Sequence, residues 1–288
     1  MFGDGDEVRR TRGDLCPGVL RPWAAQDGGL VRLRLVGGAV SVASLVALAG
    51  VAAAYGDGDV HLTGRANLQV RALPLVDGLL PAEIVDALEA TGLLPHPTHD
   101  LVRNVMVSPL SGILAGEADL RGVAQAFDDL LCADPALAGL PGRFLTVLDD
   151  GRGDVQGRSL DLGAMAVDAG QAQLRAGSSG WGAVVPLADV PAGLVALAHG
   201  FLAARGTGES AAWHVDELAV PLLAGDRDPR TWRNSGPLPY GLFDGGEHLE
   251  VPDGVLTPGR LETLVGTGSG DHLVVTPWNG IVVTAPTA

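Results

Sequence analysis

Arginine is the only basic residue type in this chain of 288 residues, because all nineteen Lys and Arg positions are Arg. Arg65 is the second residue of the stretch 64–71, and Arg103 is the first residue of the stretch 103–112. A guanidinium group can bind a carboxylate through two parallel hydrogen bonds, which an ammonium group cannot do. We therefore interpret both residues as candidate ligands for an organic anion. The alternative is that they are ordinary solvated charges, and for Arg71 the two interpretations stay equally open.

The overall charge argues against two classes of partner. The chain carries a formal net charge of −15 at pH 7 and has no run of basic residues, so its surface should repel nucleic-acid phosphates and anionic lipids. Segment 35–56 contains no charged residue and is long enough to cross a membrane. However, glycines interrupt it and its apolar residues are mostly Ala and Val, which insert weakly. We predict a cytoplasmic protein that binds neither nucleic acid nor a membrane.

Residues that could ligate a metal are few and poorly spaced. The two cysteines, Cys16 and Cys132, stand far apart, so the chain cannot supply a four-cysteine zinc site or all four thiolates of an iron–sulfur cluster. The seven histidines show no HxxxH or HExxH spacing. We therefore predict no metal site made by this chain alone. Cys132 ends an apolar helical pattern and is interpreted as an ordinary reduced thiol, whereas Cys16 lies in a turn-like, exposed stretch and its role stays open.

The elements that would position Arg65 form a strand–helix–strand unit. Residues 30–35 alternate apolar and charged side chains, which predicts a half-buried strand. Residues 41–54 predict a helix of small residues, and after a turn at 56–59 residues 60–63 predict a second strand.

The same order of elements returns near the C-terminus. The turn at 27–29 is echoed at 244–246, and the strand at 58–63 is echoed at 270–276. A helix predicted at 258–264 takes the place of the helix around 44–48. His61 and His272 fall at equivalent strand positions, which favours a structural role for both. We interpret the pattern as an internal duplication of a βαβ unit.

The region between the copies has a different pattern. It predicts helices at 81–90, 120–131 and 194–204 and a strand at 144–148. Residues 207–237 are rich in Gly, Asp, Pro and Trp and are interpreted as a loop or linker. Strands and helices mixed in this way predict an α+β fold.

Four motifs in fixed order resemble a known family. They are Cys16-Pro17-Gly18-Val19-Leu20-Arg21-Pro22-Trp23, Gly64-Arg65-Ala66-Asn67-Leu68-Gln69-Val70-Arg71, Arg103-Asn104-Val105-Met106-Val107-Ser108-Pro109-Leu110-Ser111-Gly112 and Thr276-Pro277-Trp278. Together they resemble the nitrite/sulfite reductase superfamily and are most similar to its actinobacterial precorrin-3B synthase branch. The resemblance runs from about residue 14 to residue 283.

The resemblance implies the domain organisation. It predicts two ferredoxin-like half-domains that pack about a pseudo-twofold axis and flank half of a tetrapyrrole-binding α+β domain. The expected divisions are a disordered N-terminus at 1–13, half-domain 1 at 14–75, the tetrapyrrole-binding half at 76–206, a linker at 207–236 and half-domain 2 at 237–288.

The resemblance also implies the site. Arg65 and Arg103 would bind the carboxylates of an acidic tetrapyrrole such as precorrin-3A, whose rim of acetate and propionate groups suits guanidinium groups. The other residues implied at the site are Asn67, Gln69, Arg71, Asn104 and Arg143. Arg143 fits the first position of a basic pair that helps to hold the small anion in the reductases. Leu145 stands at the second position, which argues against sulfite or nitrite reduction.

Members of this family use a 4Fe-4S cluster together with iron or sirohaem. The cluster is held by a C-x₅-C and C-x₃-C set, and the sequence reaches Ala288 without such a set. The leading expectation is a precorrin-3B synthase-like protein of aerobic cobalamin biosynthesis, which would support oxygen-dependent monooxygenation of precorrin-3A. The alternatives are a sulfite or nitrite reductase fragment, or a non-catalytic tetrapyrrole-binding half that needs a separate cysteine-bearing chain. No residue is assigned a catalytic role.

Overall fold

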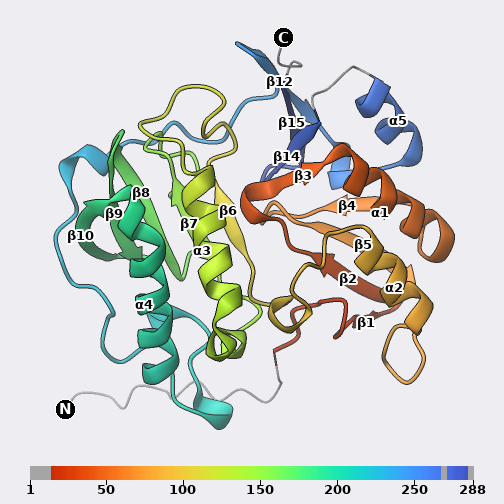
Figure 1. Cartoon of the computed structure of the whole chain (residues 1–288), viewed down its shortest axis with the longest axis horizontal. Helices are drawn as coiled ribbons and strands as arrows, with labels where there is room; N and C mark the ends of the chain where they lie inside the picture. The colour runs from red at the N-terminus through yellow and green to blue at the C-terminus, as the bar shows by residue number, and fades with distance from the viewer. Residues whose placement is uncertain (1–13, 267–270, 285–288) are drawn as a thin grey trace, which may run out of the picture.

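The computed structural model describes residues 14–266 and 271–284. Their strands form three five-stranded sheets, and five α-helices pack among them. In Figure 1 the unit with α3 and α4 lies on the left, and the two terminal units lie on the right. The predicted α+β class is confirmed.

The N-terminal unit is built around a sheet with the strand order β1-β2-β5-β4-β13. Its strands are β1 Trp23–Ala25, β2 Gly28–Leu33, β4 Val60–Leu62, β5 Leu68–Leu73 and β13 Val255–Leu256. Helix α1, Val42–Tyr55, packs on this unit, and its first turn is capped by the Ser41 hydroxyl, which accepts from the backbone N–H of Ser44 at 2.9 Å. The strand–helix–strand order predicted for residues 30–63 is confirmed.

The C-terminal unit repeats this arrangement with the strand order β11-β12-β15-β14-β3. Its elements are β11 Gly241–Phe243, β12 Gly246–Glu250, α5 Pro258–Gly266, β14 His272–Thr276, β15 Gly280–Thr284 and the borrowed strand β3 Ala39–Ser41. The helix and the second strand predicted for the repeat are thus observed. Gly270, the first residue of the predicted strand segment 270–276, lies outside the described residues. In Figure 1 the red β3 lies beside the blue β14.

The two repeated units exchange strands. Ser41 of β3 pairs with His272 of β14, and Val255 of β13 pairs with His61 of β4. The two exchanged strands therefore meet the two equivalent histidines, as a pseudo-twofold relation between the units requires. This reciprocity supports the predicted duplication and joins both units around one apolar core.

The middle unit contains a sheet with the strand order β10-β9-β8-β7-β6. Its strands are β6 Val105–Val107, β7 Thr146–Asp149, β8 Leu162–Asp168, β9 Gln171–Ala176 and β10 Gly180–Pro186. Strands β6, β7 and β8 run parallel, and the other pairs are antiparallel. Helices α3, Arg121–Ala133, and α4, Val190–Ala204, pack together over it, so the predicted helices and strand are confirmed with small shifts. Residues 205–240 contain short 3₁₀ turns and one isolated β-bridge, between Gly225 and Trp181, but no longer helix or strand.

In the described part of the chain, the helical segment 187–204 could cross a membrane if length and composition alone are considered. Its buried residues recur along one face of the helix, at Val190, Leu194, Ala198 and Phe201. That face lies in the core of the middle unit, as expected of a helix that covers a sheet. The uncharged segment 35–56 forms a 3₁₀ turn, β3 and α1 instead of one continuous helix.

Helix α2, Ala82–Ala90, lies on the other side of the expected division at residue 75. Its buried residues Ile84 and Leu88 belong to the core that the two terminal units share, and α2 packs against α1. By its side-chain packing, α2 thus belongs with the first half-domain, and the middle unit begins after it. The expectation for residues 1–13 lies outside the described residues.

Candidate anion-binding site

Arg65 stands on a tight turn between β4 and β5. The Thr63 hydroxyl accepts from the backbone N–H groups of Arg65, at 3.3 Å, and Asn67, at 3.1 Å. Ala66 takes a positive φ of 55°, a conformation that is costly for an alanine and is held by the surrounding bonds. The turn therefore fixes the start of the Arg65 side chain.

The equivalent turn of the second unit has the same shape and a different side chain. Asn279 has a φ of 56°, close to the 55° of Ala66. The two turns are separated by 213 residues in the sequence, since Thr276 matches Thr63. Trp278 therefore replaces Arg65. Arg158 donates to Gly64 O at 3.4 Å and to Pro277 O at 3.3 Å, so one arginine of the middle unit contacts both turns. The fold repeats here, but the cation does not.

Arg65 reaches the middle unit. Its Nη1 donates to the backbone oxygen of Arg143 at 2.7 Å. Burial lowers the pKa of Arg65 and the nearby Arg143 charge also lowers it, while the charges of Asp161 and Asp14 act in the opposite direction. The structure thus brings together two predicted site residues that are 78 positions apart.

A third arginine joins them that the sequence analysis did not single out. Arg32 lies on β2, its pKa is lowered by burial, and the nearby Arg65 charge lowers it as well. Gln69 stands opposite Arg32 in the β2–β5 register. With its amide oxygen turned toward Arg32, Gln69 accepts from Nε at 3.1 Å and from Nη2 at 2.7 Å. Gln69 is therefore a positioning residue for this guanidinium.

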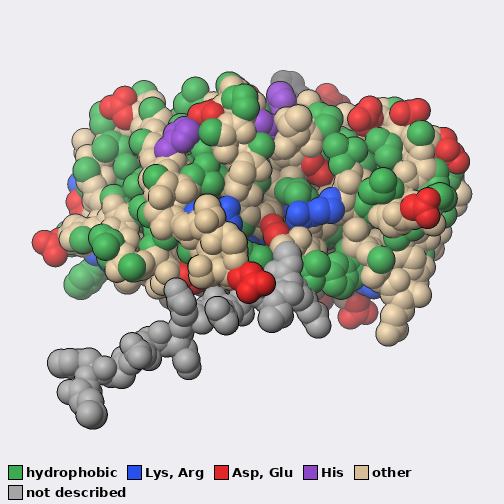
Figure 2. All heavy atoms as spheres, turned by 90° about the horizontal axis from the view of Figure 1, so that it is seen from below, with side chains coloured by type: hydrophobic (Ala, Val, Ile, Leu, Met, Phe, Trp, Pro, Cys, Tyr) green, Lys and Arg blue, Asp and Glu red, His purple; other side chains and the backbone are tan. Residues whose placement is uncertain are grey.

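These three side chains, Arg32, Arg65 and Arg143, form what we call the arginine cluster. Within residues 14–266 and 271–284 none of them forms an ion pair with a carboxylate. Arg143 is exposed, and the other two are half-buried. On the face shown in Figure 2, arginine side chains reach the surface near the middle of the molecule. The Asp161 and Asp14 charges act on Arg65 without a direct ion pair, so the neighbouring guanidinium groups still offer an anion free donors and positive charge.

The predicted site residues Asn67 and Asn104 are buried and bonded to each other. Asn67 Nδ2 donates to Asn104 Oδ1 at 3.3 Å, and Asn67 Oδ1 accepts from Leu35 N at 2.9 Å. Asn104 Nδ2 donates to Gly142 O at 2.9 Å. The two amides thus connect the turn that carries Arg65 with the residue before Arg143. Their role in the structure is to hold the arginine cluster in place.

Arg34, a second residue that the sequence analysis did not select, completes this network. Its Nε donates to Asn104 Oδ1 at 3.1 Å, and its Nη1 donates to Pro17 O at 3.1 Å and lies 3.7 Å from the Asp100 carboxylate. Burial lowers its pKa to about 10. The signal for Arg32 and Arg34 was present in the alternating stretch 30–35, since positions two apart lie on the same face of a strand.

Arg103 has a different partner from the one expected. Its Nε and Nη2 donate to the two oxygens of Asp128 on α3 at 2.8 and 2.7 Å, and both side chains are buried. Burial acts to lower the pKa of Arg103, but the bonds and charge of Asp128 outweigh it and leave the pKa raised. Arg103 was expected to bind a carboxylate of a tetrapyrrole, but in the structure it binds a carboxylate of the protein, that of Asp128. We therefore remove Arg103 from the candidate anion ligands.

Arg71 lies away from the cluster. Its Nε is 3.3 Å from Asp27 Oδ2 at the far end of β5, where both side chains are partly exposed. This position corresponds to the solvated charge that was one of its two interpretations.

The cysteines do not fit an iron–sulfur cluster, which takes four thiolates. Cys16 and Cys132 are both free and half-buried. Burial and the Asp14 charge raise the pKa of Cys16, and burial and Asp128 raise the pKa of Cys132 to about 11. Both thiols are therefore protonated at neutral pH. Cys16 is less exposed than expected, because the Asp14 carboxylate accepts from Gly142 N and ties this stretch to the middle unit.

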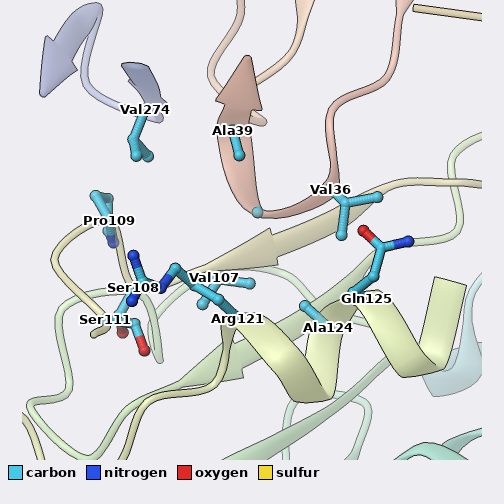
Figure 3. Close-up of a pocket in the computed structure, with 11 residues that line it drawn as sticks. Val36, Ala39, Val107, Ser108, Pro109, Ser111, Arg121, Ala124, Gln125 and Val274 are labelled. Carbon is cyan, nitrogen blue, oxygen red and sulfur yellow. The ribbon is translucent and has the colours of Figure 1, made fainter. Parts of the chain in front are cut away.

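A small cavity lies between the terminal units and the middle unit. It measures about 140 Å³ and is lined by Val36, Ala39 and Val274 on one side and by β6 and α3 residues on the other (Figure 3). Such a space holds a few water molecules and not a macrocycle. The Arg121 guanidinium that lines it is paired with Asp119 at 2.9 Å. We therefore assign this cavity no ligand.

Comparisons with known proteins show what the sequence and the fold are similar to. Residues 24–77 match the family model of the nitrite/sulfite reductase ferredoxin-like half domain. Over 172 residues the chain is 31% identical to a precorrin-3B synthase of Sinorhizobium sp., which covers 58% of this chain and 34% of that protein. Over 130 residues it is 35% identical to a ferredoxin–nitrite reductase of Synechococcus elongatus, which covers 43% of this chain and 25% of that protein.

The fold has a solved counterpart. The structure of the NirA protein of Mycobacterium tuberculosis superposes with a TM-score of 0.64 at 17% identity, over 96% of this chain and 58% of that one. The chain thus spans less than two thirds of the proteins it matches. It contains a nitrite/sulfite reductase ferredoxin-like half domain, and precorrin-3B synthase and ferredoxin–nitrite reductase are its homologues.

Proposed function

We propose that the arginine cluster binds the carboxylates of an acidic tetrapyrrole of the precorrin-3A type and that the chain is precorrin-3B synthase-like. One observation carries the proposal: Arg32, Arg65 and Arg143 converge from two units, and no protein carboxylate pairs with them in the described part of the chain. A tetrapyrrole of this type has acetate and propionate groups around its rim, which several guanidinium groups can bind together.

The chain's own residues supply binding and orientation. Asn67 and Asn104 hold the two halves of the cluster at a fixed separation, and Gln69 orients Arg32. Because these 288 residues contain only two cysteines, they do not supply the thiolates of a cluster of the kind used in this family. In the proposed function these residues bind and orient precorrin-3A for oxygen-dependent monooxygenation, and any such cluster would be held by thiolates outside them.

Titration with uroporphyrin tests the binding step, because this stable tetrapyrrole carries acetate and propionate groups. We expect Arg65→Gln to weaken binding by about ten- to a hundredfold, the loss typical of a charge-assisted hydrogen bond. The control Arg260→Gln changes an exposed arginine of α5 and should leave the affinity unchanged. Equal affinities for all three proteins would refute the binding step.

A turnover assay tests the activity. The purified protein, alone and with a polypeptide that carries the C-x₅-C and C-x₃-C set, is reconstituted with iron and sulfide and mixed with precorrin-3A and a two-electron reductant without oxygen, and oxygen is then admitted. Product from the mixture and none from the chain alone is the expected result. If neither preparation gives product although uroporphyrin binds, the protein binds a tetrapyrrole but lacks this activity.

A sulfite or nitrite reductase fragment is the second candidate, favoured by the 35% identity to the Synechococcus elongatus reductase. Against it, Leu145 is 3% exposed and packs beside Met106, Val147 and Leu160, where the resemblance expects a second basic residue for the small anion. Sirohaem absorption in the purified protein, together with sulfite-dependent oxidation of a reduced dye, would favour this candidate instead.

A further inference from the structure

A second pair of arginines lies over one tryptophan in the middle unit. The Cζ atoms of Arg175 and Arg227 are 4.6 and 4.8 Å from the Trp181 ring centroid. Arg175 stands opposite Trp181 in the β9–β10 register, and Gly225, two residues before Arg227, donates its N–H to Trp181 O at 2.8 Å. The sheet and the linker segment thus bring two guanidinium groups to the same aromatic ring.

Neither arginine of this pair has a direct carboxylate partner in the described residues, although the Asp149 charge acts on Arg175. Neither Arg175 nor Arg227 forms an ion pair with a carboxylate among residues 14–266 and 271–284. Arg175 is only 7% exposed, its Nη1 donates to Gln156 O at 3.2 Å, and its Nε has no hydrogen-bond partner. Burying a guanidinium with an unused donor beside a like charge costs free energy. The chain is rich in carboxylates, with a net charge of −15, yet none of the described ones forms an ion pair with this guanidinium.

The two arginines open onto a cavity of about 450 Å³. Its other polar lining residues are Gln156, Arg233 and Asn234, and no carboxylate lines it. Gln156 Oε1 accepts from Arg227 Nη2 at 3.0 Å, which fixes the second guanidinium. Trp232 lines the same cavity and is 71% exposed, so its indole is accessible at the opening.

We propose that this cavity is a second anion site, which binds a small carboxylate or phosphate compound through Arg175 and Arg227. Both groups present two or more anionic oxygens to a guanidinium, and the partly buried setting strengthens the attraction. Trp232 provides an apolar surface for the rest of the ligand. None of the residues of the arginine cluster lines this cavity, so the proposal does not depend on the tetrapyrrole site.

Thermal unfolding in phosphate, citrate or chloride at matched ionic strength tests the proposal, since a ligand of the folded state raises the melting temperature. We expect phosphate or citrate to raise it relative to chloride, and the more effective probe identifies the preferred oxygen chemistry. Arg227→Gln, a half-buried linker residue, should weaken binding of that probe by about tenfold or more in calorimetric titration. Arg175→Gln provides a second variant at the buried side of the cavity.

Two controls separate this cavity from other cations. Arg230→Gln changes a neighbouring exposed arginine that is already paired with Asp168 and Asp228, and it should leave the affinity unchanged. Arg260→Gln on α5 should also leave it unchanged. The proposal is overturned if neither probe stabilises the wild-type protein, or if Arg227→Gln and Arg175→Gln bind the more effective probe as tightly as the wild-type protein does.

Discussion

The guanidinium group of Arg65 donates to the backbone oxygen of Arg143 at 2.7 Å, which joins the first repeated unit to the middle unit. The bond uses the backbone of Arg143 and leaves its side chain exposed. Arg65 is therefore both a structural contact and a candidate ligand, whereas the Arg143 side chain is only a candidate ligand.

This asymmetry predicts different outcomes for two variants. Arg143→Gln should keep the melting temperature of the wild-type protein and lose about tenfold in uroporphyrin affinity, because its carbonyl still accepts from Arg65. Arg65→Gln should lose both stability and affinity. Thermal unfolding and absorbance titration of the two variants measure these effects. A large loss of stability in Arg143→Gln would show that its side chain has a structural role.

The amide network predicts a stability effect. Asn104→Ala removes the bonds to Arg34, Asn67 and Gly142 and leaves buried polar groups without partners. We expect the free energy of unfolding to fall by about 2–4 kcal/mol, measured by urea denaturation. Gln125→Ala, which removes one exposed bond to Asp129, is the control and should cost less than about 0.5 kcal/mol. Similar losses for both would contradict the role of this network.

The Arg103–Asp128 pair predicts a double-variant result. Asp128→Asn leaves a buried guanidinium with a neutral partner and should cost about 3–5 kcal/mol, while Arg103→Met with Asp128→Leu should cost less because no charge stays buried. The double variant should bind uroporphyrin as the wild type does. Weakened binding by the folded double variant would restore Arg103 as an anion ligand.

Asp154 predicts a dependence of stability on pH. Burial raises its pKa to about 7, Asp149 and Asp150 add to the increase, and the Ser108 hydroxyl at 2.7 Å partly opposes it. Because the folded pKa lies above the unfolded value, the stabilising contribution is complete at low pH and is lost as the pH rises through about 7. Between about pH 5 and about pH 7 the free energy of unfolding should fall by about 2 kcal/mol from this group.

Asp154→Asn should remove that part of the pH dependence, as measured by urea denaturation across this range. Asp86→Asn, an exposed carboxylate on α2, serves as the matched control and should keep the wild-type slope. Parallel slopes for wild type and Asp154→Asn would show that the Asp154 carboxyl does not titrate here.

The apolar setting of Leu145 predicts the outcome of restoring a basic pair. Leu145→Arg places a charge where 3% of the side chain is exposed and should cost about 3 kcal/mol or more without giving sulfite reduction. Leu130→Arg, at a position on α3 that is 44% exposed, should leave stability nearly unchanged. Thermal unfolding checks both, and a stable Leu145→Arg protein with reductase activity would favour the alternative function.

The sequence predicted what depends on local patterns. A stretch of small residues followed by a turn was sufficient for α1, and the alternating stretch 30–35 was sufficient for β2. The duplication was visible because the same turns recur. The exchange of β3 and β13 was not predicted, since strand pairing between segments more than 190 residues apart leaves no local signal.

The candidate site was predicted in part for the same reason. Arg65 and Arg143 are brought together by tertiary contacts that neither motif contains. Arg103 was interpreted as a ligand because its carboxylate partner, Asp128, is 25 residues away on another element. Arg32 was missed because charged residues that alternate in a strand are usually solvated, and only the structure shows that this face meets Gln69 and Arg65.

A crystal structure of the protein with bound uroporphyrin would show whether the arginine cluster binds a tetrapyrrole. We expect macrocycle carboxylates within hydrogen-bond distance of Arg32, Arg65 and Arg143, with Arg103 still paired with Asp128. Uroporphyrin bound elsewhere, with the arginine cluster free of carboxylates, would contradict it.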